Sequence, residues 1–368
     1  MRIDLIITEL PVGGAERCLT EIAVGLKQRG HTPRVLTLGP PPRPPRDGLL
    51  QRLQAAGVPW ESAETTSKSL APLALNRLRR MLLRDKPELV QTFLFHANVL
   101  GTAAAAMAGV PVCVGGIRVA QPRRLRVWLE RHFVRKMEAV VCVSQAVADF
   151  AKTDLAVPQA KLQVIPNAVD VERFAGATPV DWRRHDMPRD AAVGLFVGRF
   201  DPQKGLERLF AAAPEWLVAD PRRWLVLVGD GPQREWCCAQ CLQLPEQRGR
   251  VLAWQPDVAP LMQAAQVFLL TSRYEGMPNV VLEAMAAGKP VVTTAVEGVD
   301  ELLRHQTERQ VVPQGDVSAI AAAATYWLDH PEAAAAAGQA NQAIVRQDFS
   351  PASMVDRYEQ LYRSLTGR

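Results

Sequence analysis

Short apolar runs alternate with amphipathic stretches along almost the whole chain, and each apolar run has the length of a buried strand. A first series of strands is predicted at residues 5–7, 34–38, 89–93, 112–114, 140–143 and 162–165. A second series is predicted at residues 192–197, 224–228, 250–253, 267–270, 290–294 and 310–312. Helices are predicted in the gaps, and such alternation favours parallel sheets covered by helices on both faces.

The two series of strands are separated by a polar stretch, rich in Arg and Asp, at residues 178–190. A chain of 368 residues also exceeds the size at which one hydrophobic core keeps growing. The sequence therefore predicts an α/β protein with two doubly wound parallel-sheet domains that face each other across a cleft. In such sheets ligands bind at the carboxyl ends of the strands.

The two halves of the chain carry opposite net charge. Residues 1–180 hold 24 Lys and Arg against 15 Asp and Glu, a net charge of +9. The remaining residues hold 19 against 23, a net charge of −4. The first half is therefore expected to meet something anionic, such as a membrane surface, a lipid phosphate or a nucleic acid.

Several features predict a cytoplasmic protein. Residues 1–10 lack the long apolar core and the small-residue cleavage site of a signal peptide. Six Cys are too few for a disulfide framework and are typical of a reducing compartment. Residues 89–117 contain no charged side chain, but His96, Gly109 and Pro111 divide them into strand, helix and strand, which argues against a membrane span.

Two local clusters are interpreted without a ligand. Cys237, Cys238 and Cys241 have no second Cys or His pair nearby to complete a tetrahedral zinc site, so no metal is predicted. The Pro-rich segment 40–45 is expected to be a semi-rigid connector, because no second such run indicates a recognition motif.

The segment GRFDPQKG, residues 198–205, follows an apolar strand and precedes a helical stretch. Arg199 and Lys204 are therefore expected at the carboxyl end of a strand beside a helix N-terminus, an arrangement that favours a diphosphate. Two unit charges about 4 Å apart interact by roughly 4 kcal/mol at an effective dielectric near 20, so two cations would stabilise a departing diphosphate substantially. Solvated loop charges are the alternative interpretation of this motif taken alone.

The segment EGMPNVVLE begins at Glu275, crosses from a loop into a helix and ends at Glu283. The backbone amides of Gly276, Met277 and Asn279 are expected to point outward at the N-terminus of that helix. Carboxylates accept hydrogen bonds from vicinal hydroxyls, so Glu283 suits a ribose and Glu275 suits a sugar. Taken singly, each carboxylate is equally consistent with an ordinary helix charge.

Two further candidates lie in the first half. The segment PVGGAE follows the first predicted strand and places Gly13 and Gly14 in a flexible turn at its carboxyl end. His96 lies just past another predicted strand, at the same expected sheet edge, which favours a functional role for it. A plain strand-to-helix turn and a structural histidine are the alternatives.

Arginines crowd the segment near residue 124 and alternate there with apolar side chains, a pattern that predicts a basic amphipathic helix. Such a helix can lie on anionic lipid headgroups. The alternative is a solvated helix whose apolar side packs on its own domain. The residues assigned to an acceptor or a membrane are Arg118, Arg123, Arg124 and Arg126.

With these motifs assembled, the chain resembles the family 4 retaining glycosyltransferases of the GT-B fold, in particular those with a GGAE turn that assemble bacterial cell-surface glycans. The likeness extends over nearly the whole chain. It is carried by Arg199 with Lys204, Glu275 with Glu283 in an E-x7-E frame, GGAE at residues 13–16, VIPN at residues 164–167 and GDGP at residues 229–232.

The resemblance implies two Rossmann-like domains, the acceptor-binding residues 1–178 and the nucleotide-sugar-binding residues 179–349. Residues 350–368 would form a C-terminal helix that crosses back onto the first domain. The implied roles are Arg199 and Lys204 on the donor diphosphate, Glu283 on the ribose, Glu275 and His96 beside the donor sugar, and Gly14 near the diphosphate.

The predicted function is metal-independent, retaining transfer of a hexose from a nucleotide diphosphate sugar to a lipid-linked or oligosaccharide acceptor. A UDP-sugar is favoured, although Ala253 stands where the family usually has Gly and leaves the nucleobase open. No cofactor and no nucleic-acid partner are expected, and peripheral contact with the inner face of the cytoplasmic membrane is an open expectation. A non-catalytic sugar-nucleotide-binding scaffold and a sugar-nucleotide epimerase of the same fold are the alternatives.

Overall fold

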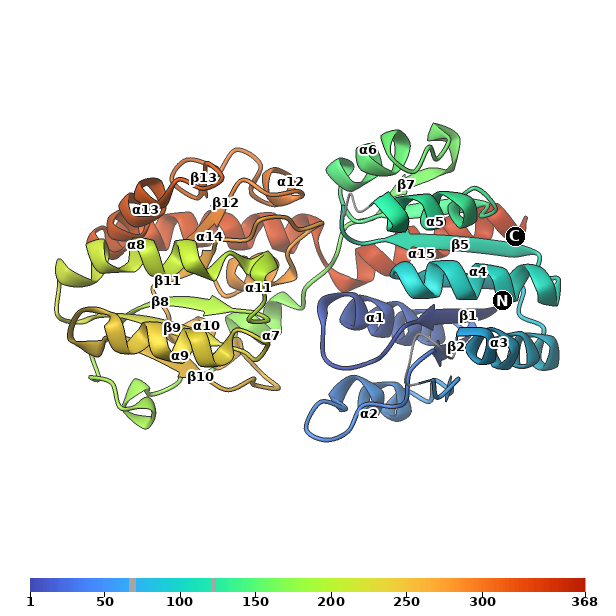
Figure 1. The fold of residues 1–368 in the computed structure, drawn as a ribbon, viewed down its shortest axis with the longest axis horizontal. Coiled ribbons are helices and arrows are strands. Elements are labelled where there is room, and N and C mark those ends of the chain that lie inside the picture. Colours follow the sequence, from blue (N-terminus) through green and yellow to red (C-terminus); the bar gives the residue numbers. More distant parts are fainter. Residues whose placement is uncertain (66–70, 121–123, 368) are drawn as a thin grey trace. The chain divides into compact units, whose positions relative to one another are not determined.

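The chain forms two compact units in the computed structural model, which describes residues 1–65, 71–120 and 124–367 (Figure 1). Unit 1 comprises Met1–Ala168 and Pro351–Arg368, and unit 2 comprises Val169–Ser350. The change of unit therefore falls earlier than residue 178, because the short helix α7 (Val171–Ala175) contacts helices of unit 2. The Gln263 side-chain amide, for example, donates to the carbonyl of Phe174 over 2.6 Å.

Unit 1 contains a seven-stranded parallel sheet in the order β3-β2-β1-β4-β5-β6-β7. Its strands are mostly buried, as their continuous apolar sequences predict. The elements are β1 (Arg2–Ile7), α1 (Gly14–Gln28), β2 (Thr32–Thr37), α2 (Gly48–Ala55), β3 (Trp60–Ser62), α3 (Ala71–Asp85), β4 (Leu89–Phe93), α4 (Phe95–Ala108), β5 (Val112–Ile117), α5 (Arg124–Val134), β6 (Ala139–Cys142), α6 (Gln145–Thr153), β7 (Leu162–Val164) and α15 (Pro351–Thr366).

Helix α15, at the end of the chain, packs against α1 within unit 1 (Figure 1). The approach is close, since a Cβ added at Gly25 of α1 would lie 2.7 Å from a methyl carbon of Val355. The fully buried ring of Tyr362 belongs to the same core as the inward-facing side chains of β1, and its hydroxyl donates to Gln91 over 3.2 Å. The expected return of the C-terminal helix to the first domain is confirmed.

Unit 2 contains a six-stranded parallel sheet in the order β10-β9-β8-β11-β12-β13. Besides α7, its elements are β8 (Ala192–Val197), α8 (Leu206–Val218), β9 (Arg223–Val228), α9 (Arg234–Gln243), β10 (Gly249–Leu252), α10 (Ala259–Ala264), β11 (Val267–Leu270), α11 (Asn279–Ala286), β12 (Val291–Thr294), α12 (Val299–Leu303), β13 (Val311–Val312), α13 (Val317–Asp329) and α14 (Pro331–Asp348). The two predicted series of strands are thus confirmed as two doubly wound sheets.

The strand order places a topological switch point in each sheet, where successive strands begin to add on the opposite side. In unit 1 this point lies between the neighbours β1 and β4, and in unit 2 between β8 and β11. Crevices that bind ligands in such sheets open at the carboxyl ends of the strands flanking a switch point. Loops that leave these four strands are therefore the candidates for a functional site.

Candidate active site

The loop after β8 carries both predicted cations. Arg199 is exposed over 66% of its side chain and forms an ion pair with Asp201 at 3.4 Å. Asp201 also accepts a hydrogen bond from the backbone N–H of Gln203 over 3.0 Å, which caps a short 3-10 helix that ends at Lys204. The loop thus holds one cation toward solvent and turns the other inward, because Lys204 is only 16% exposed.

The same loop is fixed on the end of β11 by backbone contact. Gly205 has φ +59, and a Cβ there would lie 2.3 Å from the carbonyl oxygen of Thr271. The Thr271 hydroxyl donates to the carbonyls of Lys204 and Gly205 over 3.1 and 3.0 Å. Only glycine permits both this conformation and this close approach.

The GDGP segment after β9 braces the loop from its other side. Gly231 has φ +151, and a Cβ there would lie 2.4 Å from the carbonyl oxygen of Phe200. Gly229 has φ +154, and its Cβ would lie 1.9 Å from the carbonyl oxygen of Gly198. The Phe200 N–H donates to the carbonyl of Asp230 over 2.9 Å, so the glycines of this motif position the backbone around Arg199.

Glu275, in the loop after β11, meets Lys204 directly. The lysine ammonium nitrogen lies 2.6 Å from Glu275 Oε1, and the carboxylate side chain is only 9% exposed. The Ser272 hydroxyl donates to the same oxygen over 2.6 Å. Within the residues that the structure describes, both bonds therefore engage Oε1 and leave Oε2 to accept other donors.

Glu297 was not found by sequence reasoning, yet it helps to hold this loop. Its carboxylate accepts a hydrogen bond from the backbone N–H of Glu275 over 2.9 Å. The adjacent Gly298 has φ +79, and a Cβ there would lie 2.4 Å from the carbonyl oxygen of Gly276. Glu297 follows β12, so its place at the carboxyl edge of the sheet was a signal that could have found it.

The remaining candidates of unit 2 lie where the loop enters α11. Helix α11 begins at Asn279, with Pro278 at the N-cap position. Met277 is buried, and Glu283 is a buried side chain within the helix. Because buried carboxylates are costly unless they have partners, the burial of Glu283 argues against an ordinary surface helix charge.

In unit 1 the candidates follow the two strands at the switch point. Gly13 is the N-cap residue of α1 and Gly14 its first residue, and the Glu16 side chain folds back so that a Cβ at Gly13 would lie 2.3 Å from its carboxylate. His96 is exposed near the start of α4, with its ring edge-on to Phe95 at 5.2 Å between centroids. The structure thus brings these residues to one edge of one sheet, as expected.

The set of arginines divides in the structure. Arg118, just after β5, is 8% exposed and hydrogen-bonded to Asn167, so it is buried and does not lie on the surface that contact with a membrane requires. Its guanidinium lies beside the buried Cys18 and Tyr358 and the half-buried Glu16. Burial lowers the pKa of Arg118, but these neighbours outweigh it and raise that pKa. The structural reason is that partners distant in the sequence enclose it.

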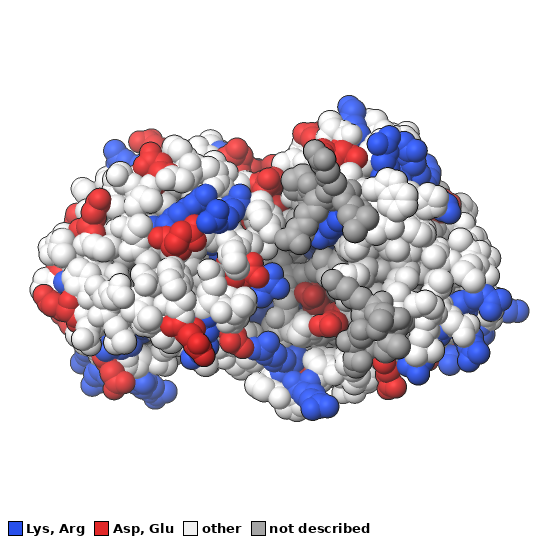
Figure 2. All heavy atoms as spheres, in the orientation of Figure 1, with Lys and Arg blue, Asp and Glu red and all other residues white. Residues whose placement is uncertain are grey.

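The rest of the basic segment belongs to helix α5. Arg126 forms an ion pair with Glu130 at 3.7 Å, and its guanidinium lies 4.8 Å from the centre of the Phe95 ring. Trp128 is 68% exposed, and Figure 2 shows a group of basic side chains on this side of unit 1, in the region of α5 and α6. Arg123 and the Arg124 side chain lie outside the described residues.

Two further observations concern metal and membrane. Cys237 and Cys241 are buried in α9, and burial raises the pKa of both thiols to about 12. No group of three or more His, Cys, Asp or Glu among the described residues could hold a metal ion. None of the described helices is both long enough and apolar enough to span a bilayer.

Comparison with known proteins relates both units to one family. A profile described as Glycosyltransferase Family 4 matches residues 12–173, and one described as Glycosyl transferases group 1 matches residues 181–343. The UDP-Gal:alpha-D-GlcNAc-diphosphoundecaprenol alpha-1,3-galactosyltransferase of Escherichia coli is 27% identical over 306 residues, 78% of each chain. The lipopolysaccharide core biosynthesis glycosyltransferase LpsE of Rhizobium meliloti (strain 1021) is 28% identical over 361 residues, 96% of each chain.

The fold is also that of a solved structure. HepE of Anabaena, in complex with UDP-glucose, superposes with a TM-score of 0.86 at 23% identity. The match covers 99% of this chain and 100% of HepE. At this level of identity the comparison shows the fold alone.

Proposed function

The chain belongs to the family 4 retaining glycosyltransferases of the GT-B fold, related to enzymes of lipopolysaccharide and glycan assembly, and from this we propose that it transfers a hexose from a UDP-sugar to a lipid-linked or oligosaccharide acceptor. The donor preference is supported by a relative named for UDP-galactose and by the UDP-glucose complex of HepE. The acceptor class is supported by the diphosphoundecaprenol in the name of the same relative.

One observation carries the assignment of the donor site: the 2.6 Å pair between Lys204 and Glu275 at the switch point of unit 2. An ammonium group has three N–H donors, so Lys204 can keep its bond to Glu275 and still donate to a phosphate oxygen. Oε2 of Glu275, which has no bond to the described residues, can accept from the hydroxyls of the donor sugar. Arg199 lies in the same loop and is exposed, so it provides a second cation for the departing diphosphate.

The other proposed roles follow the family resemblance. Glu283 accepts hydrogen bonds from the ribose hydroxyls, and the loop amides from Gly276 to Asn279 donate to the sugar nucleotide. In unit 1, His96 acts beside the donor sugar, and Gly13 with Gly14 allows a close approach to the diphosphate.

The proposed chemistry depends on electrostatics and positioning. The glycosidic bond to the diphosphate breaks as the acceptor hydroxyl attacks from the same face, and the leaving phosphate oxygen takes the acceptor's proton. Fixed cations placed where negative charge develops lower the barrier, because they need no reorganisation during the reaction. Since Arg199 and Lys204 supply this charge, we expect transfer to continue in the presence of EDTA.

The test is transfer from a panel of radiolabelled UDP-, GDP- and dTDP-sugars to lipid-linked and oligosaccharide acceptors, with the anomeric configuration of the product determined by NMR. A retained configuration with a UDP-sugar is the expected result. Lys204→Ala should lower transfer by about 100- to 1,000-fold, the usual loss for one group that stabilises developing charge. Binding of UDP with no transfer from any donor would instead support the non-catalytic scaffold, and an altered nucleotide sugar would support an epimerase.

Arg273→Ala is the matched control for Lys204→Ala. Arg273 also lies in the loop after β11, but it is exposed and pairs with Glu207 at 2.7 Å. Its removal should change transfer by less than about twofold, because exposed ion pairs contribute little. Thermal unfolding of both variants separates a loss of chemistry from a loss of folded protein, and equal transfer by both would contradict the role of Lys204.

A further inference from the structure

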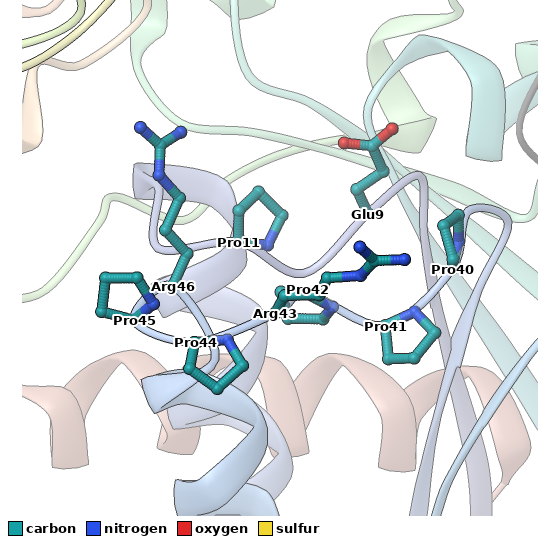
Figure 3. Close-up of a pocket in the computed structure, with 9 residues that line it drawn as sticks. All are labelled: Glu9, Pro11, Pro40, Pro41, Pro42, Arg43, Pro44, Pro45 and Arg46. Atoms are coloured by element: carbon teal, nitrogen blue, oxygen red, sulfur yellow. The ribbon is translucent and has the colours of Figure 1, made fainter.

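We propose that the Pro-rich loop between β2 and α2 forms the acceptor subsite, and that this subsite takes the phosphate or diphosphate group of a phosphorylated sugar acceptor. The proposal rests on the proposed transferase function and adds a ligand class to it. Its basis is a pocket of about 400 Å³ in unit 1 (Figure 3). The lining residues are Glu9, Pro11, Pro40, Pro41, Pro42, Arg43, Pro44, Pro45 and Arg46.

The pocket lies at the functional edge of the unit 1 sheet. Its lining residues follow the carboxyl ends of β1 and β2, which pair in parallel. Strand β1 also flanks the switch point and leads into the Gly13-Gly14 turn. A ligand held here would therefore lie beside the edge at which sheets of this type bind their substrates.

The base of the loop is fixed by hydrogen bonds. The Gly39 N–H donates to the carbonyl of Thr8 over 2.8 Å, and the Gly39 carbonyl accepts from the hydroxyls of Thr37 and Ser62 over 2.8 and 2.7 Å. The Thr65 hydroxyl donates to the carbonyl of Leu38 over 2.7 Å. Proline rings then restrict the backbone of the loop, so binding would cost little conformational entropy.

The position of Glu9 depends on this base. A Cβ at Gly39 would lie 2.9 Å from Glu9 Cγ, so the glycine leaves room for the glutamate side chain to lie over it. Figure 3 shows Glu9 and Arg46 extending to the same side of the loop, with Arg43 between the prolines and Glu9. Three charged groups thus border an otherwise apolar, proline-lined surface, and a few polar groups on an apolar lining are the usual composition of a ligand site.

The charges define the ligand. Two arginines against one glutamate favour an anion, and each guanidinium group can bind two oxygens of one phosphate. Within the described residues neither the Arg43 side chain nor the Glu9 side chain forms a hydrogen bond or an ion pair, so both can serve a ligand without first breaking such a contact. Glu9 accepts from sugar hydroxyls, and the proline rings cover the apolar face of the sugar. A sugar joined to a phosphate provides a partner for the arginines, for Glu9 and for the proline rings.

Two sources share this chemistry: a lipid-linked sugar diphosphate and a phosphorylated oligosaccharide. The experiment is calorimetric titration of the full chain, with its nucleotide site saturated by UDP. The probes are the 1-phosphates of glucose, galactose, mannose and N-acetylglucosamine, each matched by its neutral methyl glycoside. A second arm uses prenyl diphosphate sugars in detergent micelles.

We expect at least one phosphate to bind ten times or more as tightly as its methyl glycoside. Arg43→Ala combined with Arg46→Ala should weaken that binding by about 100-fold, about tenfold for each charged hydrogen-bonding group. Arg52→Ala, which removes an exposed arginine of α2 that pairs with Glu21, should leave the affinity within twofold. Tighter binding in the micelle arm alone identifies the lipid-linked source, and equal binding in both arms identifies the sugar phosphate itself as the ligand.

The proposal is overturned if no phosphate binds better than its methyl glycoside, or if the double variant binds as tightly as the wild type. Because Arg43 and Arg46 are exposed, the double variant should remain folded, which thermal unfolding checks. Donor hydrolysis distinguishes this failure from that of the proposed function. If UDP is still released from a UDP-sugar while the acceptor KM of the double variant is unchanged, only the subsite is wrong. If no donor is turned over while phosphate binding is intact, the transferase assignment is wrong.

Discussion

Units 1 and 2 have sheets of the same construction, but they hold their candidate residues in different ways. In unit 2 the loops after β8 and β11 are joined by the Lys204–Glu275 ion pair and by a backbone contact at Gly205, and Gly231 braces the first of these loops from the segment after β9. In unit 1 the corresponding loops carry a glycine turn and the exposed His96. The same fold therefore fixes charge in one unit and leaves side chains accessible in the other, a division that suits a charged leaving group and a variable acceptor.

The largest expected effect tests whether the loops of unit 2 are locked together by their glycines. Gly231→Ala should destabilise unit 2 by about 3 kcal/mol or more, because alanine is strained at φ +151 and its Cβ would meet the backbone of Phe200. Hydrogen exchange should increase in peptides from β8 and β9 and stay unchanged in β1 and β4. UDP binding should weaken as the loop around Arg199 moves.

Gly315→Ala separates backbone strain from the clash. Gly315 has φ +81, but an added Cβ would meet nothing within 4 Å, so only the conformational cost of about 1–2 kcal/mol remains. Equal destabilisation by the two substitutions would show that the contact between the loops contributes nothing.

An intermediate effect is expected in unit 1. His96→Ala should lower kcat by about 100-fold if the imidazole acts beside the reacting sugar, while the Kd for UDP stays within twofold. Steady-state kinetics and calorimetry measure the two quantities separately. His132→Ala, which removes an exposed histidine of α5, should change neither. A loss of UDP binding in His96→Ala would place this residue in nucleotide binding and remove the contrast between the units.

The smallest effect concerns the attachment of α15 to unit 1. The Glu359 carboxylate lies 2.9 Å from His31 Nε2, and this hydrogen bond, with that from Arg363, lowers the pKa of Glu359 despite partial burial. A depressed carboxyl pKa stabilises the folded state above the unfolded pKa, and the contribution is lost as pH falls through the folded pKa. Glu359→Gln should therefore cost at most about 1 kcal/mol at neutral pH, with the difference vanishing in acid.

Thermal unfolding of wild type and Glu359→Gln between pH 7 and pH 3 measures this convergence. Arg29 pairs with both Asp356 and Glu359, and Asp356 is the more exposed of the two. Asp356→Asn on the same helix should therefore lower the stability less than Glu359→Gln does. A difference between wild type and Glu359→Gln that grows in acid would reverse the assigned sign.

The sheets could be predicted because their strands are continuous apolar runs, and every strand so predicted is present. Strand β3 was missed, since Trp60–Ser62 is short, lies at the sheet edge and lacks that pattern. The edge at which the candidate residues lie follows from the parallel alternation alone. The contact between Lys204 and Glu275 does not, because it depends on how two loops distant in the sequence fold over each other.

Arg118 shows how local pattern misleads. This arginine at the start of a basic run was assigned to an acceptor or a membrane, but it is enclosed by partners from three other segments, among them Cys18, Asn167 and Tyr358. The Pro-rich loop shows the converse, since a segment expected to be only a connector lines a pocket once Glu9 and Pro11 are brought beside it. In both cases the missing information was tertiary contact.

The return of α15 to unit 1 has a consequence for how the protein is made. Unit 2 is one continuous stretch of chain, Val169–Ser350, inserted between the two segments of unit 1. On the ribosome unit 1 begins first but cannot bury the faces of α1 and β1 that α15 covers until residues 351–366 have been synthesised. The half of the molecule translated second is thus the first that can complete its core.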